Sequence, residues 1–493
     1  MLHIPLLRGG RPYRSLEARQ LLDVRTGEPV AELSQANRGL IAKELAATGA
    51  ARRALQDLSV RELLEICRRA ARLFAEADLP LGVAGETQSP ADWMRQLSAT
   101  CGLPETLCGL NLEKVRSVLD GMDKVLDGLT RGLDLSVLDP GMAMEASQSS
   151  RRLSYLPQTE ALGAILPSNS PGVHNLWLPA LALKVPVALK PGRDEPWTPF
   201  RICQALMAAG LPPAALGFYP GDHAGAAEIL LRCGRSMLFG DEATVRPWKA
   251  DSRVQIHGPG WSKVLFGEDQ VPQWERHLDL LVASIAENGG RSCLNASGVW
   301  LPAVKRGVGR ELAEALARRL AAIEALPLDH PQARLAAFPR PQMAHQISGL
   351  IDRHLRVPGA VDLTAEIRGR GRVAEVGGCA FLLPTVVWCE DPDHPLANTE
   401  LLFPFASVVQ MPDGSRREEM LARIGPTLVG TALTEDESFQ RKLLDCPWID
   451  RLNLGPIPTS RISWDQPHEG NLFAHLYRQR AIQAVPAVVE ARA

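Results

Sequence analysis

The segment Glu287–Cys293, which reads ENGGRSC, carries the clearest chemical signal in the chain. It places one cysteine shortly after two glycines, and glycine lets a backbone turn tightly and approach a ligand closely. The apolar run Gly298–Leu301 predicts a strand that would hold this turn in place. A thiol presented in this way suits nucleophilic catalysis, provided that its pKa is depressed so that the thiolate forms.

The other cysteines show no pattern of metal ligands or redox pairs. Nine cysteines are scattered along 493 residues, and no Cys-x-x-Cys pair occurs. The sequence therefore predicts no zinc ribbon, no dithiol site and no bound metal. The odd number leaves at least one thiol outside any intramolecular disulfide, which favours a reducing, cytoplasmic setting. Most of these cysteines are expected to be small apolar core residues.

The composition is typical of a large globular protein. The length exceeds the usual size of one domain, so two or more domains are expected. The net charge is −2 and no long basic run occurs, so neither nucleic acid nor an anionic membrane surface is an expected partner. The N-terminus has no pattern of a secretory signal, and no apolar run reaches the roughly 18 residues of a membrane helix.

After the first third of the chain, helix-like and strand-like patterns alternate. Val185–Leu189, Ala215–Tyr219 and Ser236–Phe239 are predicted strands, and Thr198–Ala209 is a predicted helix between two of them. A second series of such elements follows Cys293. Strands that alternate with helices predict parallel, doubly wound sheets. The fold class is therefore α/β, with two domains and the key cysteine near their junction.

Five separated motifs occur in the order found in the aldehyde dehydrogenase superfamily, and the chain resembles that superfamily from about Asp23 to its C-terminus. The motifs are LPSNSP at 166–171, VALKP at 187–191, the Asn-x-Gly-x-x-Cys spacing at 288–293, PTV at 384–386 and ELLFP at 400–404. Because they occur together and in order, the resemblance is far more specific than any one motif.

The resemblance implies roles for four residues. Cys293 stands where the family has the cysteine that forms a thioester, and Asn169 where an asparagine amide donates to the oxyanion. Lys190 matches a lysine that contacts the adenosine ribose, and Glu400 a glutamate that holds the nicotinamide ribose. Without the resemblance, Asn169 also suits a simple turn, and Lys190 and Glu400 also suit solvated surface positions.

Three departures from the family's pattern concern acyl release and phosphate binding. His257 stands where the family carries a general-base glutamate; histidine accepts a proton near neutral pH, but here it also suits a structural role in a glycine- and proline-rich turn. Arg193 replaces a ribose-binding glutamate and suits either a phosphate of NADP or coenzyme A or a plain surface position. The pyrophosphate turn, in which Gly240 is the expected cofactor contact, continues with Asp241 and Glu242, whose carboxylates would repel a phosphate.

Two further segments bear on the type of chemistry. The run GDEA at 240–243 is similar to bacterial acyl-CoA reductases of the same superfamily, whose CoA-dependent members also lack the glutamate. The run QPHEGN at 466–471 matches no family motif. Within it, His468 and Glu469 suit either an acid–base pair or a pair that fixes a loop.

The resemblance also implies a domain organisation. A Rossmann-like cofactor domain is expected over residues 1–143 and 160–260, and an α/β catalytic domain over 261–479. A small β oligomerisation element is expected from 144–159 and 480–493, which implies a homodimer or homotetramer.

The leading hypothesis is an oxidoreductase that uses NAD or NADP and acts on a small-molecule aldehyde or acyl substrate through a cysteine thioester, most simply by aldehyde oxidation. The first alternative is an acyl-CoA reductase or CoA-acylating aldehyde dehydrogenase, with coenzyme A as co-substrate, because the glutamate is missing. The second alternative is a non-catalytic binding or scaffold member of the fold, because the pyrophosphate turn is acidic.

Overall fold

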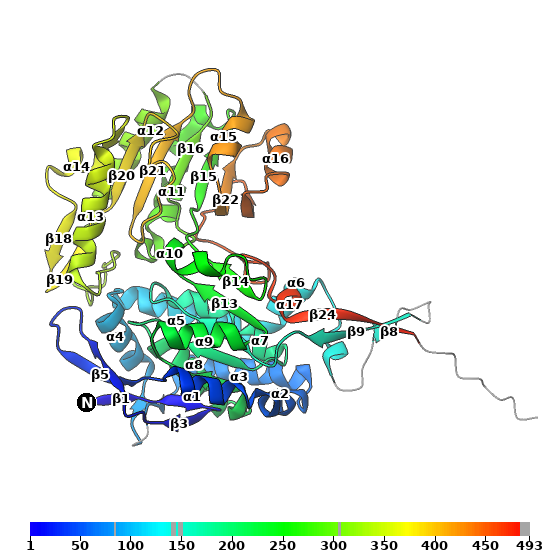
Figure 1. Ribbon diagram of the computed structural model, residues 1–493. Coiled ribbons are helices and arrows are strands. Elements are labelled where there is room, and N and C mark those ends of the chain that lie inside the picture. Colours follow the sequence, from blue (N-terminus) through cyan, green and yellow to red (C-terminus); the bar gives the residue numbers. More distant parts are fainter. Residues whose placement is uncertain (83–84, 140–143, 146–150, 304–306, 484–493) are drawn as a thin grey trace, which may run out of the picture.

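The protein is described here by a computed structural model that covers residues 1–82, 85–139, 144–145, 151–303 and 307–483. Figure 1 shows two lobes, each built on its own sheet, and an arm that projects from the first lobe. The first lobe holds most elements up to β14 (Val254–His257), and the second holds β15 (Lys263–Phe266) to β23 (Ile449–Leu454).

The sheet of the first lobe has five parallel strands in the order β14-β13-β10-β11-β12, followed by two antiparallel N-terminal strands. The parallel strands besides β14 are β10 (Leu162–Ile165), β11 (Val187–Lys190), β12 (Leu216–Phe218) and β13 (Arg235–Phe239), and the two additions are β2 (Leu6–Arg8) and β3 (Arg11–Tyr13). A separate three-stranded sheet, β1-β5-β4, is formed by β1 (Leu2–Ile4), β4 (Ala18–Leu22) and β5 (Pro29–Ser34).

Helices cover both faces of the first sheet. One face, with Leu162 and Leu189, packs on the helices α3 (Val60–Glu76), α4 (Pro90–Cys101), α5 (Glu105–Asp120), α6 (Met122–Thr130) and α8 (Trp197–Ala208). The other face, with Ile165 and Ala188, packs on α1 (Arg38–Leu45) and α9 (His223–Arg232). Successive strand residues point to opposite faces, so both faces need apolar side chains, as doubly wound sheets do.

The sheet of the second lobe has the order β17-β20-β21-β16-β15-β22-β23, parallel except for the edge strand β17 (Ala360–Asp362). Its other strands are β16 (Gly298–Leu301), β20 (Thr385–Cys389), β21 (Phe405–Gln410) and β22 (Thr427–Leu433). One face packs on α11 (Leu278–Ala286), α12 (Val308–Ala321) and α14 (Leu363–Arg368), the other on α13 (Pro341–Leu355), α15 (Arg417–Arg423) and α16 (Glu437–Leu444). Two parallel sheets covered by helices confirm the predicted α/β class.

Helix α3 illustrates how the sequence specifies its element. Ser59 caps the helix by accepting from the Glu62 backbone N–H, while the Glu62 carboxylate accepts from the Ser59 backbone N–H. Leu63, Ala70 and Phe74 are buried at helical spacing. The helical pattern expected over residues 35–77 is divided, however, into α1, α2 (Thr48–Gln56) and α3.

Prolines account for two differences between expected and observed elements. The pattern over 176–184 predicts a helix, but the structure has a 3-10 turn, η2 (Pro171–Leu176), and a one-turn helix, α7 (Pro179–Ala182). Pro179 lacks an N–H for a helical bond and therefore starts a new helix instead of continuing one. The apolar pattern over 381–388 predicts one strand, but Pro384 separates β19 (Cys379–Leu382) from β20.

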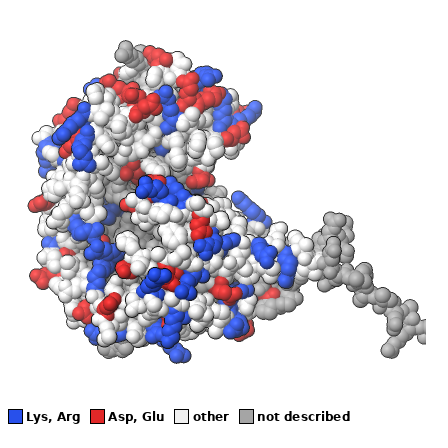
Figure 2. All heavy atoms as spheres, in the orientation of Figure 1, with Lys and Arg blue, Asp and Glu red and all other residues white. Residues whose placement is uncertain are grey.

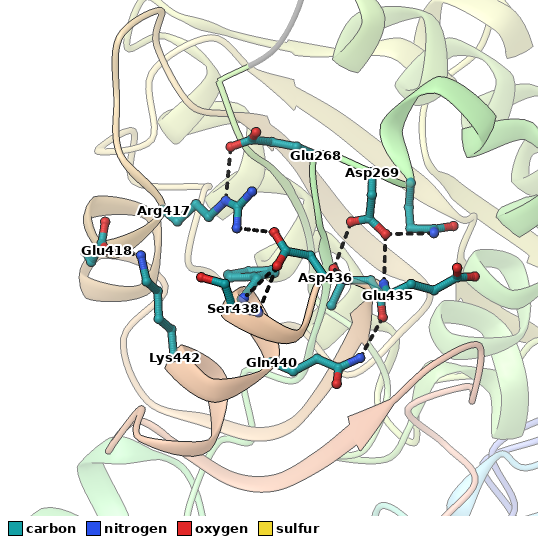
Figure 3. A network of polar contacts seen from close by, with 12 residues as sticks. Glu268, Asp269, Arg417, Glu418, Glu435, Asp436, Ser438, Gln440 and Lys442 are labelled. Atoms are coloured by element: carbon teal, nitrogen blue, oxygen red, sulfur yellow. Dashed lines mark hydrogen bonds and ion pairs between the residues drawn. The ribbon is translucent and has the colours of Figure 1, made fainter.

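A polar network secures the far edge of the second lobe, where β15 and β22 end (Figure 3). Arg417 of α15 donates to Glu268 at 3.1 Å and to Asp436 at 2.5 Å, and Asp436 caps the start of α16. Asp269 accepts from the Glu435 backbone N–H at 2.8 Å. This edge is the opposite one from the amino ends of β15 and β16, which leaves those ends available for a site.

The arm is a three-stranded antiparallel sheet, β24-β9-β8, built from β8 (Met144–Glu145), β9 (Arg151–Pro157) and β24 (Tyr477–Gln483) (Figure 1). β24 is an edge strand. Residues 146–150 and 484–493 of the expected oligomerisation element lie outside the described residues. Among the described helices, none combines the length and the apolar character needed to cross a bilayer.

A substitution at Gly102 tests the contact between the two lobes. This glycine ends α4 with a φ of 76°, and a Cβ atom there would lie 2.3 Å from the Ala337 carbonyl oxygen. We expect Gly102→Ala to destabilise the protein by roughly 2 kcal/mol or more, because it adds left-handed strain to a steric clash. Thermal unfolding measures this change. Gly49→Ala, within α2 and free of close contacts, is the matched control and should leave the melting temperature unchanged or raise it; equal losses in both variants would contradict the interpretation.

Candidate active site

Cys293 follows a tight turn whose conformation depends on glycine. Asn288, Gly289 and Gly290 have φ values of 53°, 66° and 67°, all in the left-handed region. At Gly290 a Cβ atom would lie 2.3 Å from the backbone nitrogen of Pro404, so a larger residue would force the backbone apart. The turn therefore places Cys293 directly before β16 and against the segment that contains Glu400.

Polar contacts hold the cysteine loop against the first lobe. The Asn169 amide donates to the Arg291 carbonyl at 2.8 Å, and the Asn288 amide donates to the Ser170 hydroxyl at 3.1 Å. On the side of the second lobe, the Ser262 hydroxyl donates to the Cys293 carbonyl at 2.8 Å. From the sequence, the Asn169 amide was expected to donate to an oxyanion. In the structure, one of its two N–H groups donates to the Arg291 carbonyl instead, and the other is left.

Arg291 also joins the two lobes, from a buried position between them. Its guanidinium is buried and donates to the carbonyls of Cys101 and Ala337, one from each lobe. The ring of Phe338 lies 5.2 Å from the guanidinium carbon. Burial lowers the pKa of Arg291, and carbonyl dipoles and the ring face stabilise its charge.

A cavity of about 270 Å³ opens beside Cys293 at the junction of the lobes. Its apolar wall is formed by Val173, Leu176, Phe239, Leu294, Ile462 and Trp464. Its polar lining includes Asn111, Lys114, Ser170, Asn288, Ser460, Arg461 and His468. The size and the mixed lining suit a small organic molecule that is fixed by a few polar groups.

The thiol itself is not activated by its surroundings, and the condition of a depressed pKa is not met. Burial raises the pKa of Cys293 well above 9.0, and the carboxylates of Glu469 and Glu400 raise it further. A thiolate in low dielectric next to two negative charges is disfavoured on both counts. In the protein alone, Cys293 is therefore a protonated thiol at neutral pH.

Lys190 is the last residue of β11 and Arg193 follows it, at the carboxyl end where parallel sheets bind ligands. Lys190 is half-buried, burial lowers its pKa, and it has no hydrogen-bond or ion-pair partner within the described ranges. Arg193 is exposed, and among the described residues its only hydrogen bond is the one that its carbonyl accepts from Arg19. An unpaired, partly desolvated ammonium beside a free guanidinium fits the hydroxyls and phosphates of a nucleotide.

The turn after β13 is less suited to a pyrophosphate. Asp241 caps the short helix α10 (Glu242–Val245) by accepting from the Thr244 N–H at 2.8 Å, and Glu242 pairs with Lys249 at 2.7 Å. The turn thus uses its own carboxylate where a phosphate would otherwise bind. At Gly240 a Cβ atom would meet the Thr244 side chain at 2.7 Å, so this glycine has a packing reason as well as the expected cofactor role.

Glu400 lies at the base of the cysteine loop. Its carboxylate accepts the backbone N–H of Trp261, and burial raises its pKa to about 7. Lys263, also buried, faces the same region, and burial lowers its pKa to about 7. Glu400 is therefore close enough to Cys293 to influence its charge, as a residue that contacts the nicotinamide end of a cofactor would be.

His257 lies behind the cavity wall, not on it. Its ring stacks on Phe239 at 4.3 Å, because the two residues are register partners on β14 and β13. Its Nδ1 is hydrogen-bonded to the Glu469 carboxylate. The histidine that lines the Cys293 cavity is His468. Sequence reasoning assigned no role to Trp464, Ser460 and Asn111, because no motif marks them and only the fold brings them to Cys293.

The face of the molecule seen in Figure 2 carries no large patch of one charge sign. Figure 2 shows acidic and basic side chains intermixed on the visible face, and a hollow between the lobes. Nothing on this face indicates a polyanionic partner.

The match to known families is decisive for the class of protein. The model described as "Aldehyde dehydrogenase family" matches residues 142–432. This stretch includes Asn169, Lys190, Cys293 and Glu400 and covers more than half of the chain. The chain belongs to the aldehyde dehydrogenase family, as the sequence motifs indicated.

Characterised relatives are distant. Geranial dehydrogenase of Castellaniella defragrans is 24% identical over 50% of this chain and 52% of its own length. Betaine aldehyde dehydrogenase of Cereibacter sphaeroides is 25% identical over 57% of this chain and 58% of its own length. The chain thus matches only about half the length of these relatives.

Solved structures share the whole fold. An aldehyde dehydrogenase from Brucella melitensis biovar abortus superposes with a TM-score of 0.75 and 17% identity, covering 98% of this chain and 97% of the other. A putative methylmalonate-semialdehyde dehydrogenase from Sinorhizobium meliloti, complexed with NAD, gives a TM-score of 0.76 at 17% identity, with 99% of each chain covered. At these identities the likeness establishes the fold.

The raised pKa of Cys293 predicts how it reacts with an alkylating agent. We expect iodoacetamide to modify Cys293 slowly at about pH 7 and steadily faster towards about pH 9, since only the thiolate reacts. Glu400→Gln removes a negative charge, so it should lower the pKa of Cys293 and speed modification at about pH 8. Peptide mass spectrometry separates Cys293 from the partly exposed Cys446. A rate that does not change across this pH range would mean that the thiolate is already formed.

Proposed function

We propose that this protein is an NAD- or NADP-dependent oxidoreductase that oxidises a small-molecule aldehyde through a covalent thioester on Cys293. The observation that carries the proposal is the position of Cys293: on a glycine turn that faces a substrate-sized cavity between two parallel sheets. Family membership supports the chemistry, and the residues 1–143 with 160–260 are proposed as the cofactor domain and 261–479 as the catalytic domain.

The first half of the reaction belongs to the cysteine loop. The Cys293 thiol loses its proton to solvent, and the sulfur adds to the aldehyde carbon to form a thiohemiacetal. The second N–H of the Asn169 amide and the backbone N–H of Cys293 are the donors available to the oxyanion. The loop contacts that orient Asn169 also fix the cysteine, so nucleophile and donor keep a constant separation.

The residues present fit a nicotinamide dinucleotide at two points. Lys190 and Arg193 would hold the adenosine end, and Glu400 the nicotinamide ribose, with Gly240 near the pyrophosphate. The bound nicotinamide would accept the hydride from the thiohemiacetal carbon and leave a thioester on Cys293. The free Arg193 guanidinium suits NADP as well as NAD.

Acyl release distinguishes two candidate functions. Water converts the thioester to a carboxylic acid and makes the enzyme a hydrolytic dehydrogenase. Coenzyme A would instead make it a CoA-acylating dehydrogenase or, in reverse, an acyl-CoA reductase; the absence of a glutamate at His257 and the acidic turn at 240–243 favour keeping this alternative. The two are distinguished by measuring the absorbance of reduced nicotinamide with a panel of aldehydes and with NAD or NADP, each with and without coenzyme A. No absorbance change in any condition would support the non-catalytic alternative.

The proposal requires Cys293. We expect Cys293→Ala to abolish aldehyde-dependent NAD(P)H formation while the melting temperature stays within a few degrees of the parent. Cys446→Ala is the matched control, since Cys446 is also free and partly exposed but lies outside the cavity. Turnover that persists in Cys293→Ala would refute the covalent mechanism.

We further propose that the chain forms a homodimer or homotetramer through the arm. β24 presents an unpaired edge with exposed Arg478, Gln479 and Arg480, and such an edge readily pairs with another strand. Light scattering should then give two or four times the chain mass of 53.6 kDa. A monodisperse monomer at micromolar concentration would contradict this assembly.

A further inference from the structure

A second, much smaller cavity lies behind the Cys293 cavity. Its volume is about 30 Å³, and Leu176, Trp464 and His468 line both cavities. This volume is enough for at least one water molecule. The shared wall places the small cavity next to the Cys293 cavity, on the side of β14.

The lining of the small cavity presents an unusual concentration of unpartnered polar atoms. Asn175 Nδ2 and Oδ1, Gln255 Oε1, His257 Nε2 and His468 Nδ1 are all buried without a hydrogen-bond partner in the part of the chain that the structure describes. Asn175, His257 and His468 are only 2%, 3% and 8% exposed. Buried polar groups are normally satisfied. One donor group and several acceptors around a water-sized space match what a buried water needs.

Glu469 connects the two histidines. Its carboxylate is hydrogen-bonded to His257 Nδ1 and lies 3.7 Å from His468 Nε2. Burial opposes its charge, but the two imidazoles outweigh burial and lower the pKa of Glu469, so the carboxylate is ionised. A carboxylate that accepts the Nδ1–H of His257 leaves His257 Nε2 as a free proton acceptor. The two free ring nitrogens, one on each histidine, therefore belong to the walls of the small cavity.

The Glu469 backbone is placed as firmly as its side chain. The Gln255 amide, two residues before His257 on β14, donates to the Glu469 carbonyl at 2.7 Å. The next residue, Gly470, has a φ of 119°, and a Cβ atom there would lie 2.5 Å from the Gln255 amide nitrogen. The segment 466–471, which matches no sequence motif, is thus fastened to the strand where the family carries its general-base glutamate.

We propose that the small cavity is a water site and that His468, its water, His257 and Glu469 form a proton relay that serves thioester hydrolysis at Cys293. This inference rests on the proposed function and names the group that acts in place of the missing glutamate. It extends the expected role of His257, which is separated from the cavity by His468 and works through it.

The relay accounts for both protons of the water that hydrolyses the thioester. Water in the Cys293 cavity forms a C–O bond to the thioester carbon and gives one proton to His468 Nε2, while the proton on His468 Nδ1 passes through the buried water to His257 Nε2, where Glu469 stabilises the imidazolium. The C–S bond then breaks, and the proton returns to the sulfur to restore the thiol. The second proton of the water leaves with the carboxylic acid product.

An activated ester tests the relay without cofactor or knowledge of the natural aldehyde. p-Nitrophenyl acetate should acylate Cys293 and release one burst of p-nitrophenolate, after which turnover is limited by hydrolysis of the acetyl thioester. We expect His468→Gln, His257→Gln and Glu469→Gln to keep the burst but slow the steady state about a hundredfold. Intact-protein mass spectrometry should then show the acetylated chain accumulating.

Two further variants separate relay from structure. Asn175→Leu keeps the branched shape and the number of side-chain heavy atoms but removes a polar side chain from the water site, and it should slow hydrolysis about tenfold without changing the burst. In His468→Ala, added imidazole should restore hydrolysis, a rescue that a purely structural role would not give. His475→Gln is the matched control, because His475 lies just after the segment 466–471, bonds to the Ser236 carbonyl and lines neither cavity; it should leave both phases unchanged.

The outcomes are distinguishable. A normal burst with unchanged hydrolysis in the His468, His257 and Glu469 variants would overturn the relay but leave the proposed function intact. Loss of burst and hydrolysis together, at unchanged melting temperature, would also overturn it and assign these residues to acylation. No burst from the parent protein, together with no oxidation of any aldehyde, would refute the proposed function and the relay with it.

Discussion

The close approach of backbone to backbone at Gly290 is the constraint on which the site depends. The cysteine loop can lie against Phe403 and Pro404 only because no side chain intervenes there. This contact fixes the position of Cys293 near the amino ends of β15 and β16. It also brings Glu400 close enough to Cys293 to raise the pKa of the thiol. The Asn169 and Asn288 contacts then join this loop to the carboxyl edge of the other sheet. The cavity beside Cys293 lies at this junction.

The electrostatics of the junction oppose formation of the Cys293 thiolate, which the proposed reaction needs. Two carboxylates and a low dielectric hold Cys293 as a thiol, which protects it from oxidation and alkylation while the site is idle. The same carboxylates suit the later stages of the proposed reaction, because Glu469 is hydrogen-bonded to His257 and Glu400 is the residue proposed to hold the nicotinamide ribose. The raised pKa is a property of the surroundings and not of the cysteine.

The sequence predicted the elements whose patterns are local. β22 begins and ends where its apolar run does, and α3 follows its capping box and apolar spacing. The N-terminal strands β2 and β3 went unrecognised because each has only three residues, and because β2 pairs with the distant strand β12 while β3 pairs with β2. The family motifs similarly pointed to Cys293, while its raised pKa arises from carboxylates distant in sequence. His257 and Glu469 are 212 positions apart, and no spacing rule connects them.

Three of the contacts across the seam between the lobes pair a side-chain donor with a main-chain acceptor. Asn169 and Thr106 of the first lobe donate to the carbonyls of Arg291 and Ala333, and Arg291 donates back to the carbonyl of Cys101. Every residue type carries the same carbonyl, so these accepting positions place no demand on side-chain chemistry. At these contacts the need for a particular side chain falls on the donor residue, and the accepting position is free to diverge wherever packing allows.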